Sequence, residues 1–129
     1  MEHLYTGDHR CLVTHQSREQ ILTDAPSDHD GKDRSFAPTD LLVAAVGNAT
    51  LTAMGIHAGH LGWNMFGTTA STTKYMAKSG PRRVERIEIN VEFPFTLNES
   101  QRTILKETGL TNPVYLSIKD SIAVEFTFN

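Results

Sequence analysis

Residues 36–61, FAPTDLLVAAVGNATLTAMGIHAGHL, are the part of this chain that most limits how it can fold. The chain carries no Asp, Glu, Lys or Arg from Leu41 to Thr73, although 21% of its residues are charged. Two opposite helical stripes of this segment hold apolar, small or neutral side chains, so neither is a typical solvent face. We therefore expect a helix that is buried on nearly every side. One stripe is Leu42, Ala45, Val46, Ala49, Thr52, Ala53 and Ile56, and the other is Val43, Gly47, Thr50, Met54, His57 and Leu61.

Both ends of this helix are marked in the sequence. Proline is favoured at the first helical position, where its missing amide hydrogen costs no hydrogen bond, and Pro38 fits that position. Asp40 then falls in the first turn, where a negative charge suits the helix dipole. Gly59 and Gly62 are typical stop residues. The pattern predicts a helix from Pro38 to about His60.

Size and charge limit the classes of protein and partner. A length of 129 residues favours a single domain spanning residues 1–129. The net charge of −3 argues against nucleic acids and anionic membranes, which select basic surfaces. The longest unbroken apolar run, Leu41–Val46, is far shorter than the ~20 residues of a membrane span. The chain starts without a signal-peptide pattern, and its lone cysteine, Cys11, allows no intrachain disulfide. We expect a cytoplasmic protein.

The remaining elements follow from alternation and capping patterns. Thr96 and Glu99 have the spacing of a capping box at the start of a helix that ends near Gly109. Asn112 and Pro113 are typical of the N-cap and first position of a second, short helix. Alternating apolar residues and Thr-rich runs predict strands at His9–Thr14, Ile21–Thr23, Trp63–Met76, Val84–Phe95 and Ser121–Phe128.

This order of elements predicts an α+β fold with a largely antiparallel sheet, because helices and strands do not alternate regularly. A fully buried central helix would need more covering elements than one chain of this size supplies. A second copy of the chain is the natural cover. We therefore expect an obligate homodimer with the central helix in its interface.

Four features together resemble the OsmC/Ohr family of organic hydroperoxide reductases, over nearly the whole chain. They are the helix entry Phe36–Leu42, the Ala-rich run Ala44–Thr50, the strand pair around Arg82–Arg83 and Ile87–Phe95, and the restart Asn112–Val114. The resemblance implies an OsmC-like fold, in which an antiparallel sheet wraps around a long buried central helix. It also implies an intertwined homodimer with two active sites at the subunit interface.

The same resemblance implies where the family's chemistry would lie. Active members carry a peroxidatic cysteine on the central helix and a resolving cysteine before the Pro-Val of the later helix. This chain has Ala49 and Asn112 at those two positions. The family's acidic partner would fall at Thr39, with Asp40 next to it. Either the chain is a non-peroxidase relative or Ala49 replaces an original cysteine.

The family's activating cation has two candidates, Arg34 and Arg10, and the sequence does not decide between them. Its role in the family is to lower the pKa of the reactive thiol, because a positive charge stabilises the thiolate. Cys11 could be a relocated nucleophile, but free cysteines are more often small buried residues.

No metal or cofactor is predicted. His57 and His60 are spaced for metal binding but equally suit the end of a helix. The acidic stretch Asp24–Arg34 lacks the glutamate of an EF-hand and is predicted to be a solvated loop.

The sequence therefore predicts a dimer that binds a small apolar ligand at the interface, with little peroxidase activity. The expected pocket residues are Asn48, Ala49, Thr52 and Ala53. Two alternatives stay open at this point. One is a hydroperoxide reductase that uses Cys11, or whose parent has cysteine in place of Ala49. The other is a structural or regulatory dimer with no ligand.

Overall fold

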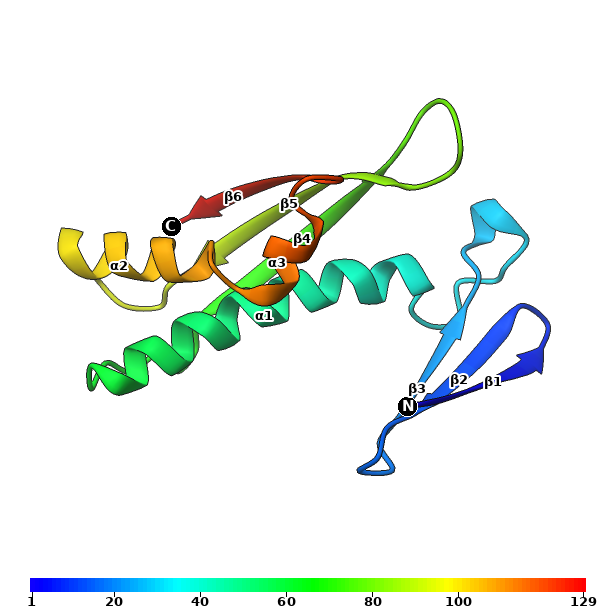
Figure 1. Cartoon of the computed structure of the whole chain (residues 1–129), viewed down its shortest axis with the longest axis horizontal. Coiled ribbons are helices and arrows are strands. Elements are labelled where there is room, and N and C mark those ends of the chain that lie inside the picture. The colour runs from blue at the N-terminus through cyan, green and yellow to red at the C-terminus, as the bar shows by residue number, and fades with distance from the viewer. The chain divides into compact units, whose positions relative to one another are not determined.

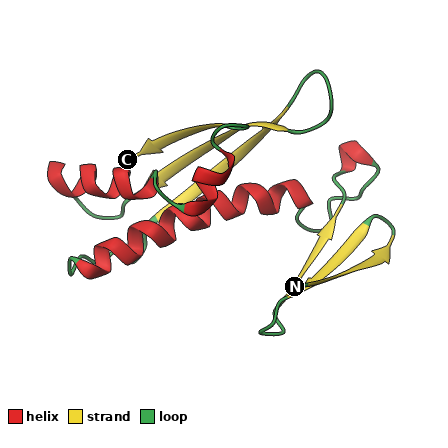
Figure 2. Ribbon diagram, viewed as in Figure 1, coloured by secondary structure: helices red, strands yellow, loops and turns green.

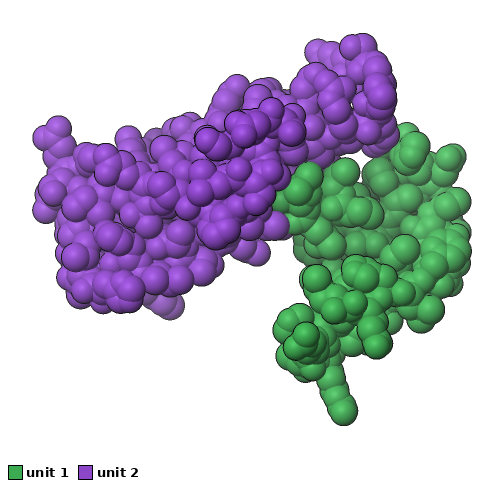
Figure 3. All heavy atoms as spheres, viewed as in Figure 1, with its two compact units in different colours: residues 1–42 green, residues 43–129 purple.

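The computed structural model describes all residues, 1–129, and divides the chain into two compact units. Unit 1 comprises residues 1–42 and unit 2 comprises residues 43–129 (Figure 3). Each unit has a three-stranded sheet of its own (Figure 1). The α+β class predicted from the sequence is confirmed, but the strands form two small sheets and not one.

Unit 1 is built on an antiparallel meander in the order β1-β2-β3. The strands are β1 (Glu2–Gly7), β2 (Arg10–Thr14) and β3 (Gln20–Asp24), followed by the 3-10 turn η1 (Ser27–His29). The sequence patterns predicted the second and third strands but missed the first. Because β1 is exposed at all but its last residue, it carries little of the apolar alternation that marks a half-buried strand.

Very little of unit 1 is buried. Ala37 is its only apolar side chain among the buried core residues of the chain. Leu4 and Tyr5 are 61% and 63% exposed, and Ile21 is 43% exposed. The sheet of unit 1 therefore has almost no apolar core of its own, and hydrophobic burial within the unit does little to stabilise it.

Unit 2 combines three helices with a sheet in the order β4-β5-β6 (Figure 2). Its strands are β4 (Thr69–Met76), β5 (Val84–Glu92) and β6 (Ala123–Phe128), and its complete helices are α2 (Glu99–Gly109) and α3 (Pro113–Ile118). The predicted hairpin of β4 and β5 is antiparallel, whereas β6 pairs with β5 in parallel. The strand predictions were several residues too long at their loop ends.

Helix α1 (Pro38–His60) starts and ends where the sequence signals placed it. Its buried residues lie on one stripe, and they are Val43, Val46, Gly47, Thr50, Met54 and Ala58. Close approach to this stripe depends on glycine. A Cβ added at Gly47 would lie 2.9 Å from the Cγ2 of Thr72, and one at Gly109 would lie 3.2 Å from the Sδ of Met54. These two positions let β4 and the end of α2 contact α1.

The opposite stripe of α1 is exposed in the single chain. Ala45, Asn48 and Thr52 are exposed, and Ile56 is 59% exposed. The single chain therefore leaves this stripe uncovered, and the expectation that a second copy covers it stays a prediction. Asn48 and Thr52 are neutral, so the exposed stripe carries no charge to hold it in water.

Length and composition alone would allow α1 to cross a membrane, with a mean hydropathy of 1.5 over its most apolar stretch. One third of that stretch, 33%, is buried inside the protein. Core helices of globular proteins meet the same length and composition criteria.

The two later helices test the capping predictions. Helix α3 has Asn112 as its N-cap and Pro113 at its first position, as predicted. Helix α2 begins after a capping box formed by Asn98 and Gln101, so the predicted box of Thr96 and Glu99 is wrong. Asn is a better N-cap than Thr, and the box at Asn98 leaves the two preceding residues outside the helix.

Candidate functional site

Ala49 lies on α1 at the edge between its buried and exposed stripes. Its side chain is half-buried, between the exposed Asn48 and the fully buried Thr50. Thr52 is exposed and Ala53 is half-buried. The four predicted pocket residues thus form a strip of methyl groups flanked by an amide and a hydroxyl.

Asn112 lies beside Thr50, the residue that follows Ala49 on α1. Its side chain is buried, with 1% exposed, and its amide donates hydrogen bonds to the Thr50 hydroxyl at 3.2 Å and the Gly109 carbonyl at 2.8 Å. Its carbonyl oxygen accepts the backbone N–H of Tyr115 at 2.8 Å. Thr50 in turn donates to the Val46 carbonyl at 2.9 Å. Asn112 therefore joins α1, α2 and α3 through neutral hydrogen bonds.

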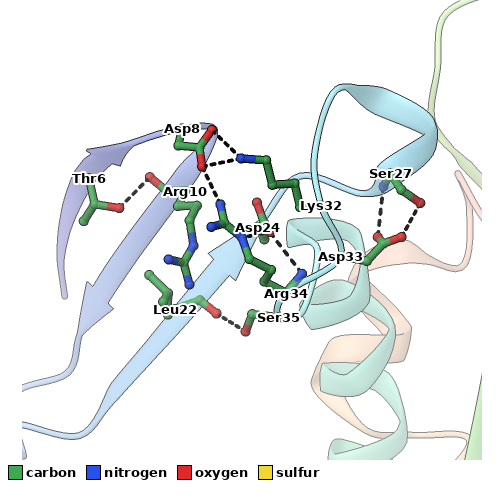
Figure 4. Close-up of polar contacts among 10 residues, drawn as sticks. All are labelled: Thr6, Asp8, Arg10, Leu22, Asp24, Ser27, Lys32, Asp33, Arg34 and Ser35. Atoms are coloured by element: carbon green, nitrogen blue, oxygen red, sulfur yellow. Dashed lines mark hydrogen bonds and ion pairs between the residues drawn. The ribbon is translucent and has the colours of Figure 1, made fainter.

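Arg34, one of the two predicted cations, is held by two carboxylates in unit 1 (Figure 4). Its backbone N–H and its Nε donate to the same Asp24 oxygen, at 3.0 and 3.2 Å. Its Nη2 lies 2.6 Å from an oxygen of Asp8, which Lys32 also contacts at 3.1 Å. The Asp24 side chain is fully buried, so Arg34 supplies the main charge that compensates it.

These contacts shift the ionisation of all three partners. The backbone N–H of Arg34 is the largest cause that lowers the pKa of Asp24, and its guanidinium adds to the effect against the opposing influence of burial. The guanidinium hydrogen bond of Arg34 lowers the pKa of Asp8, with help from Lys32. The same two carboxylates raise the pKa of Arg34. The guanidinium of Arg34 is therefore occupied by its ion pairs with Asp24 and Asp8.

Arg10, the other predicted cation, lies directly opposite Asp24 in the pairing of β2 with β3. Its Nε is buried without a hydrogen-bond partner, and so is the Oδ1 of Asp24. Its charge still contributes weakly to lowering the pKa of Asp24. Of the two arginines, Arg10 is the one whose guanidinium is not tied to a carboxylate by hydrogen bonds.

The acidic candidates lie in the first turn of α1. Asp40 accepts the backbone N–H of Ala37 at 2.8 Å, so its carboxylate caps the start of the helix. Thr39 is half-buried beside it. The structure thus gives Asp40 a helix-capping role that its first-turn position had already indicated.

The structure brings together some of the predicted residues and adds two that the sequence did not single out. Asn112 meets Thr50, the residue after Ala49, whereas Arg34 meets Asp24 and Asp8. Thr50 was expected only as one member of a buried stripe of the central helix, and Asp24 was interpreted as part of a solvated acidic loop. The signal that the sequence lacked for Asp24 is the strand register, which places it opposite Arg10.

The acidic loop is ordered by specific contacts. The backbone N–H of Ser27 donates to Asp33 at 3.0 Å, and the Ser27 hydroxyl also bonds to Asp33. Gly31 is required because an added Cβ would lie 1.6 Å from the carbonyl oxygen of Ala25. Across residues 1–129, no group of three or more His, Cys, Asp or Glu side chains is placed to hold a metal ion.

One solved structure decides the family. A protein from Psychrobacter arcticus, named for osmotic stress induction and a detoxification response, is 39% identical to this chain. The match covers 99% of this chain and 93% of that one, with a TM-score of 0.94. The chain belongs to the OsmC/Ohr family.

More distant members share the OsmC/Ohr fold. The Legionella pneumophila organic hydroperoxide resistance protein OsmC is 11% identical, with a TM-score of 0.77 over 100% of this chain and 97% of its own. An organic hydroperoxide resistance protein from Elizabethkingia anophelis is 18% identical, with a TM-score of 0.77 over 100% and 99%. No family model and no curated protein matches this chain.

The OsmC/Ohr family is one of oxidative and osmotic stress proteins, and the resemblance seen in the sequence is confirmed.

The position of Asn112 has a testable structural consequence. Asn112→Ala removes three hydrogen bonds and leaves a buried void, so we expect it to lower the free energy of unfolding by about 2–3 kcal/mol.

The matched control is Asn98→Ala, which removes the exposed N-cap of α2 and should cost about 1 kcal/mol. Urea unfolding of both variants measures the difference. Equal costs would show that the buried contact of Asn112 with Thr50 adds nothing to its capping role.

The ion pair of Arg34 predicts an acid-sensitive stability. The pKa of Asp24 is lowered in the folded state from its ordinary value of 3.8, so the stability it contributes is present above that pH and is lost as the pH falls through the lowered pKa. We expect Asp24→Asn to destabilise the protein at about pH 7, and the gap to the wild type to shrink as the pH falls toward about 3.

Urea midpoints across that pH range provide the measurement. Asp120→Asn, which changes an exposed aspartate outside any ion pair, should match the wild type throughout. A gap between Asp24→Asn and the wild type that stays constant with pH would contradict the assignment.

Proposed function

We propose that this chain is an OsmC/Ohr protein without the family's thiol chemistry, which acts as a cytoplasmic homodimer that binds a small apolar ligand. The observation that carries the proposal is the exposed stripe of α1. It is apolar or neutral along its length, and it overlaps the predicted pocket strip of Asn48, Ala49, Thr52 and Ala53.

Ala49 and Asn112 lack the sulfur atoms that the family's thiol chemistry requires. Reduction of a peroxide by a cysteine needs a thiolate that attacks an oxygen, releases the alcohol and becomes a sulfenic acid. A methyl group at Ala49 can neither ionise nor take up oxygen in this way. The amide of Asn112 cannot close a disulfide, and its hydrogen bonds to Thr50 and Gly109 give it a structural use.

A second copy of the chain is the cover that best fits the exposed surfaces. Unit 1 has large exposed apolar side chains and only Ala37 buried, and α1 exposes Ile56 beside neutral residues. Burial of apolar area is the main favourable term in such association, at about 25 cal/mol per Å². An identical partner would cover the same helix stripe on both copies at once.

The ligand would occupy the strip around Ala49. Its methyl groups favour an apolar molecule, and the amide of Asn48 and the hydroxyl of Thr52 could bind one polar group. Apolar pockets with few polar groups are the usual form of small-molecule sites.

The alternative enzyme is a peroxidase that uses Cys11. One observation favours it, since the Cys11 thiol is exposed and is the only thiol in the chain. The same assay therefore has to compare the wild type with a variant that lacks this cysteine.

Consumption of cumene hydroperoxide, with dithiothreitol or a lipoyl reductant, tests the proposal. We expect the wild type and Cys11→Ser to stay at the background rate. Ala49→Cys should restore a nucleophile, and the double variant Ala49→Cys with Asn112→Cys should turn over at least about 100-fold faster than the wild type. Robust turnover by the wild type that disappears in Cys11→Ser would establish the alternative.

Ligand binding needs its own readout. We expect an apolar fluorescent dye to bind saturably to the wild type and to lose its site in Ala49→Arg, which places a charge in the apolar strip. Ser117→Arg on α3, an exposed position, is the control and should leave the dye bound. If the wild type binds no dye, the hypothesis of a structural or regulatory dimer with no ligand is favoured.

A further inference from the structure

A small pocket that is open to solvent lies wholly within unit 1, between its sheet and the start of α1, with a volume of about 290 Å³. This pocket is called the cavity below. It shares no residue with the strip around Ala49 and does not depend on the function proposed for that strip. Its lining residues come from three strands and one helix, and they are His3, Cys11, Val13, Thr23, Pro38 and Leu41.

The strand register explains why these side chains meet. His3 lies opposite Val13 in the pairing of β1 with β2, and Cys11 lies opposite Thr23 in the pairing of β2 with β3. Directly opposed residues share a face of the sheet, and so do Cys11 and Val13, which are two positions apart. All four therefore lie on one face of the β1-β2-β3 sheet.

The cavity has an apolar wall and a polar end. Val13, Pro38 and Leu41 supply the wall. The hydroxyl of Thr23 is already used, because it donates to the Cys11 carbonyl at 3.3 Å. The remaining polar groups are the His3 imidazole and the Cys11 thiol, and neither side chain makes a hydrogen bond or ion pair in the protein.

We propose that this cavity is a binding site for a small apolar molecule with one hydroxyl or carbonyl group. The volume is at the lower limit of small-molecule pockets, which start near ~300 Å³, so it suits a short chain or a single ring. The apolar part would contact Val13, Pro38 and Leu41. The polar group would bind the imidazole of His3 or the thiol of Cys11, both of which are exposed and make no hydrogen bond within the protein.

The probe is 1-hexanol, titrated into ¹⁵N-labelled wild-type protein with amide shifts as the readout. We expect saturable shifts at Cys11, Val13 and Thr23 with a Kd of about 1 mM, a typical affinity for so small a ligand. Bound 1-hexanol should also slow alkylation of Cys11 by iodoacetamide. The matched probe 1,6-hexanediol has the same length but places a second hydroxyl against the apolar wall, so it should bind about 10-fold more weakly.

Two variants that each introduce a threonine locate the site. Val13→Thr keeps the side-chain shape and places a hydroxyl in the wall, so it should weaken 1-hexanol binding by about 3- to 10-fold. Ile21→Thr changes the residue opposite Val13 on the same sheet face but outside the cavity, and should bind as the wild type does.

Equal binding of the two probes, shifts that do not saturate, or equal weakening by the two variants would overturn the proposal. If either variant fails to fold, the comparison of probes on the wild type still decides. The peroxide and dye assays concern the strip around Ala49, so their failure is distinguishable from failure here.

Discussion

The structure depends on the packing of one stripe of α1 within unit 2. Gly47 lets the Thr72 side chain of β4 approach the helix, and Gly109 brings the end of α2 against Met54 and Thr50. The buried hydrogen bond from Asn112 to Thr50 then sets the start of α3 against the same stripe. Interiors pack at the density of organic crystals, so such close approaches require these residue types in these positions.

That packing also determines which residues remain exposed. With one stripe of α1 buried, the stripe through Ala45, Asn48, Thr52 and Ile56 remains exposed and uncharged. Unit 1 has a similar problem, because its only buried apolar side chain is Ala37, which lies just before α1 and outside the sheet. A second copy of the chain would resolve both problems at once, and the proposed ligand strip overlaps the surface that it would cover.

The sequence predicted what local signals determine. The ends of α1, the cap at Asn112 and the alternation of β5 depend on residues close together in the chain, and all three appear in the structure. The sequence could not decide what covers the other stripe of α1, because an uncharged stripe looks the same whether the chain itself or a partner covers it. The cap of α2 was misplaced because two overlapping patterns, at Thr96 and at Asn98, compete within a few residues.

The candidate site was predictable only in part. The resemblance assigns Ala49 and Asn112 to the family's two cysteine positions, and that assignment stays a prediction. The partner of Asn112 and the use of Arg34 could not be predicted, because both depend on contacts between residues distant in sequence. Asp24 meets Arg34 through the fold of unit 1, and Thr50 meets Asn112 across 62 positions.

The state of association tests the account most directly, because a second copy of the chain is proposed to cover the exposed stripe of α1. Light scattering on the purified protein, over a range of concentrations, should give twice the chain mass of 14.3 kDa. Ile56→Lys should shift that mass toward one chain, whereas Thr127→Lys on the exposed face of β6 should leave it unchanged. A stable, folded wild-type monomer with the mass of a single chain would contradict the account.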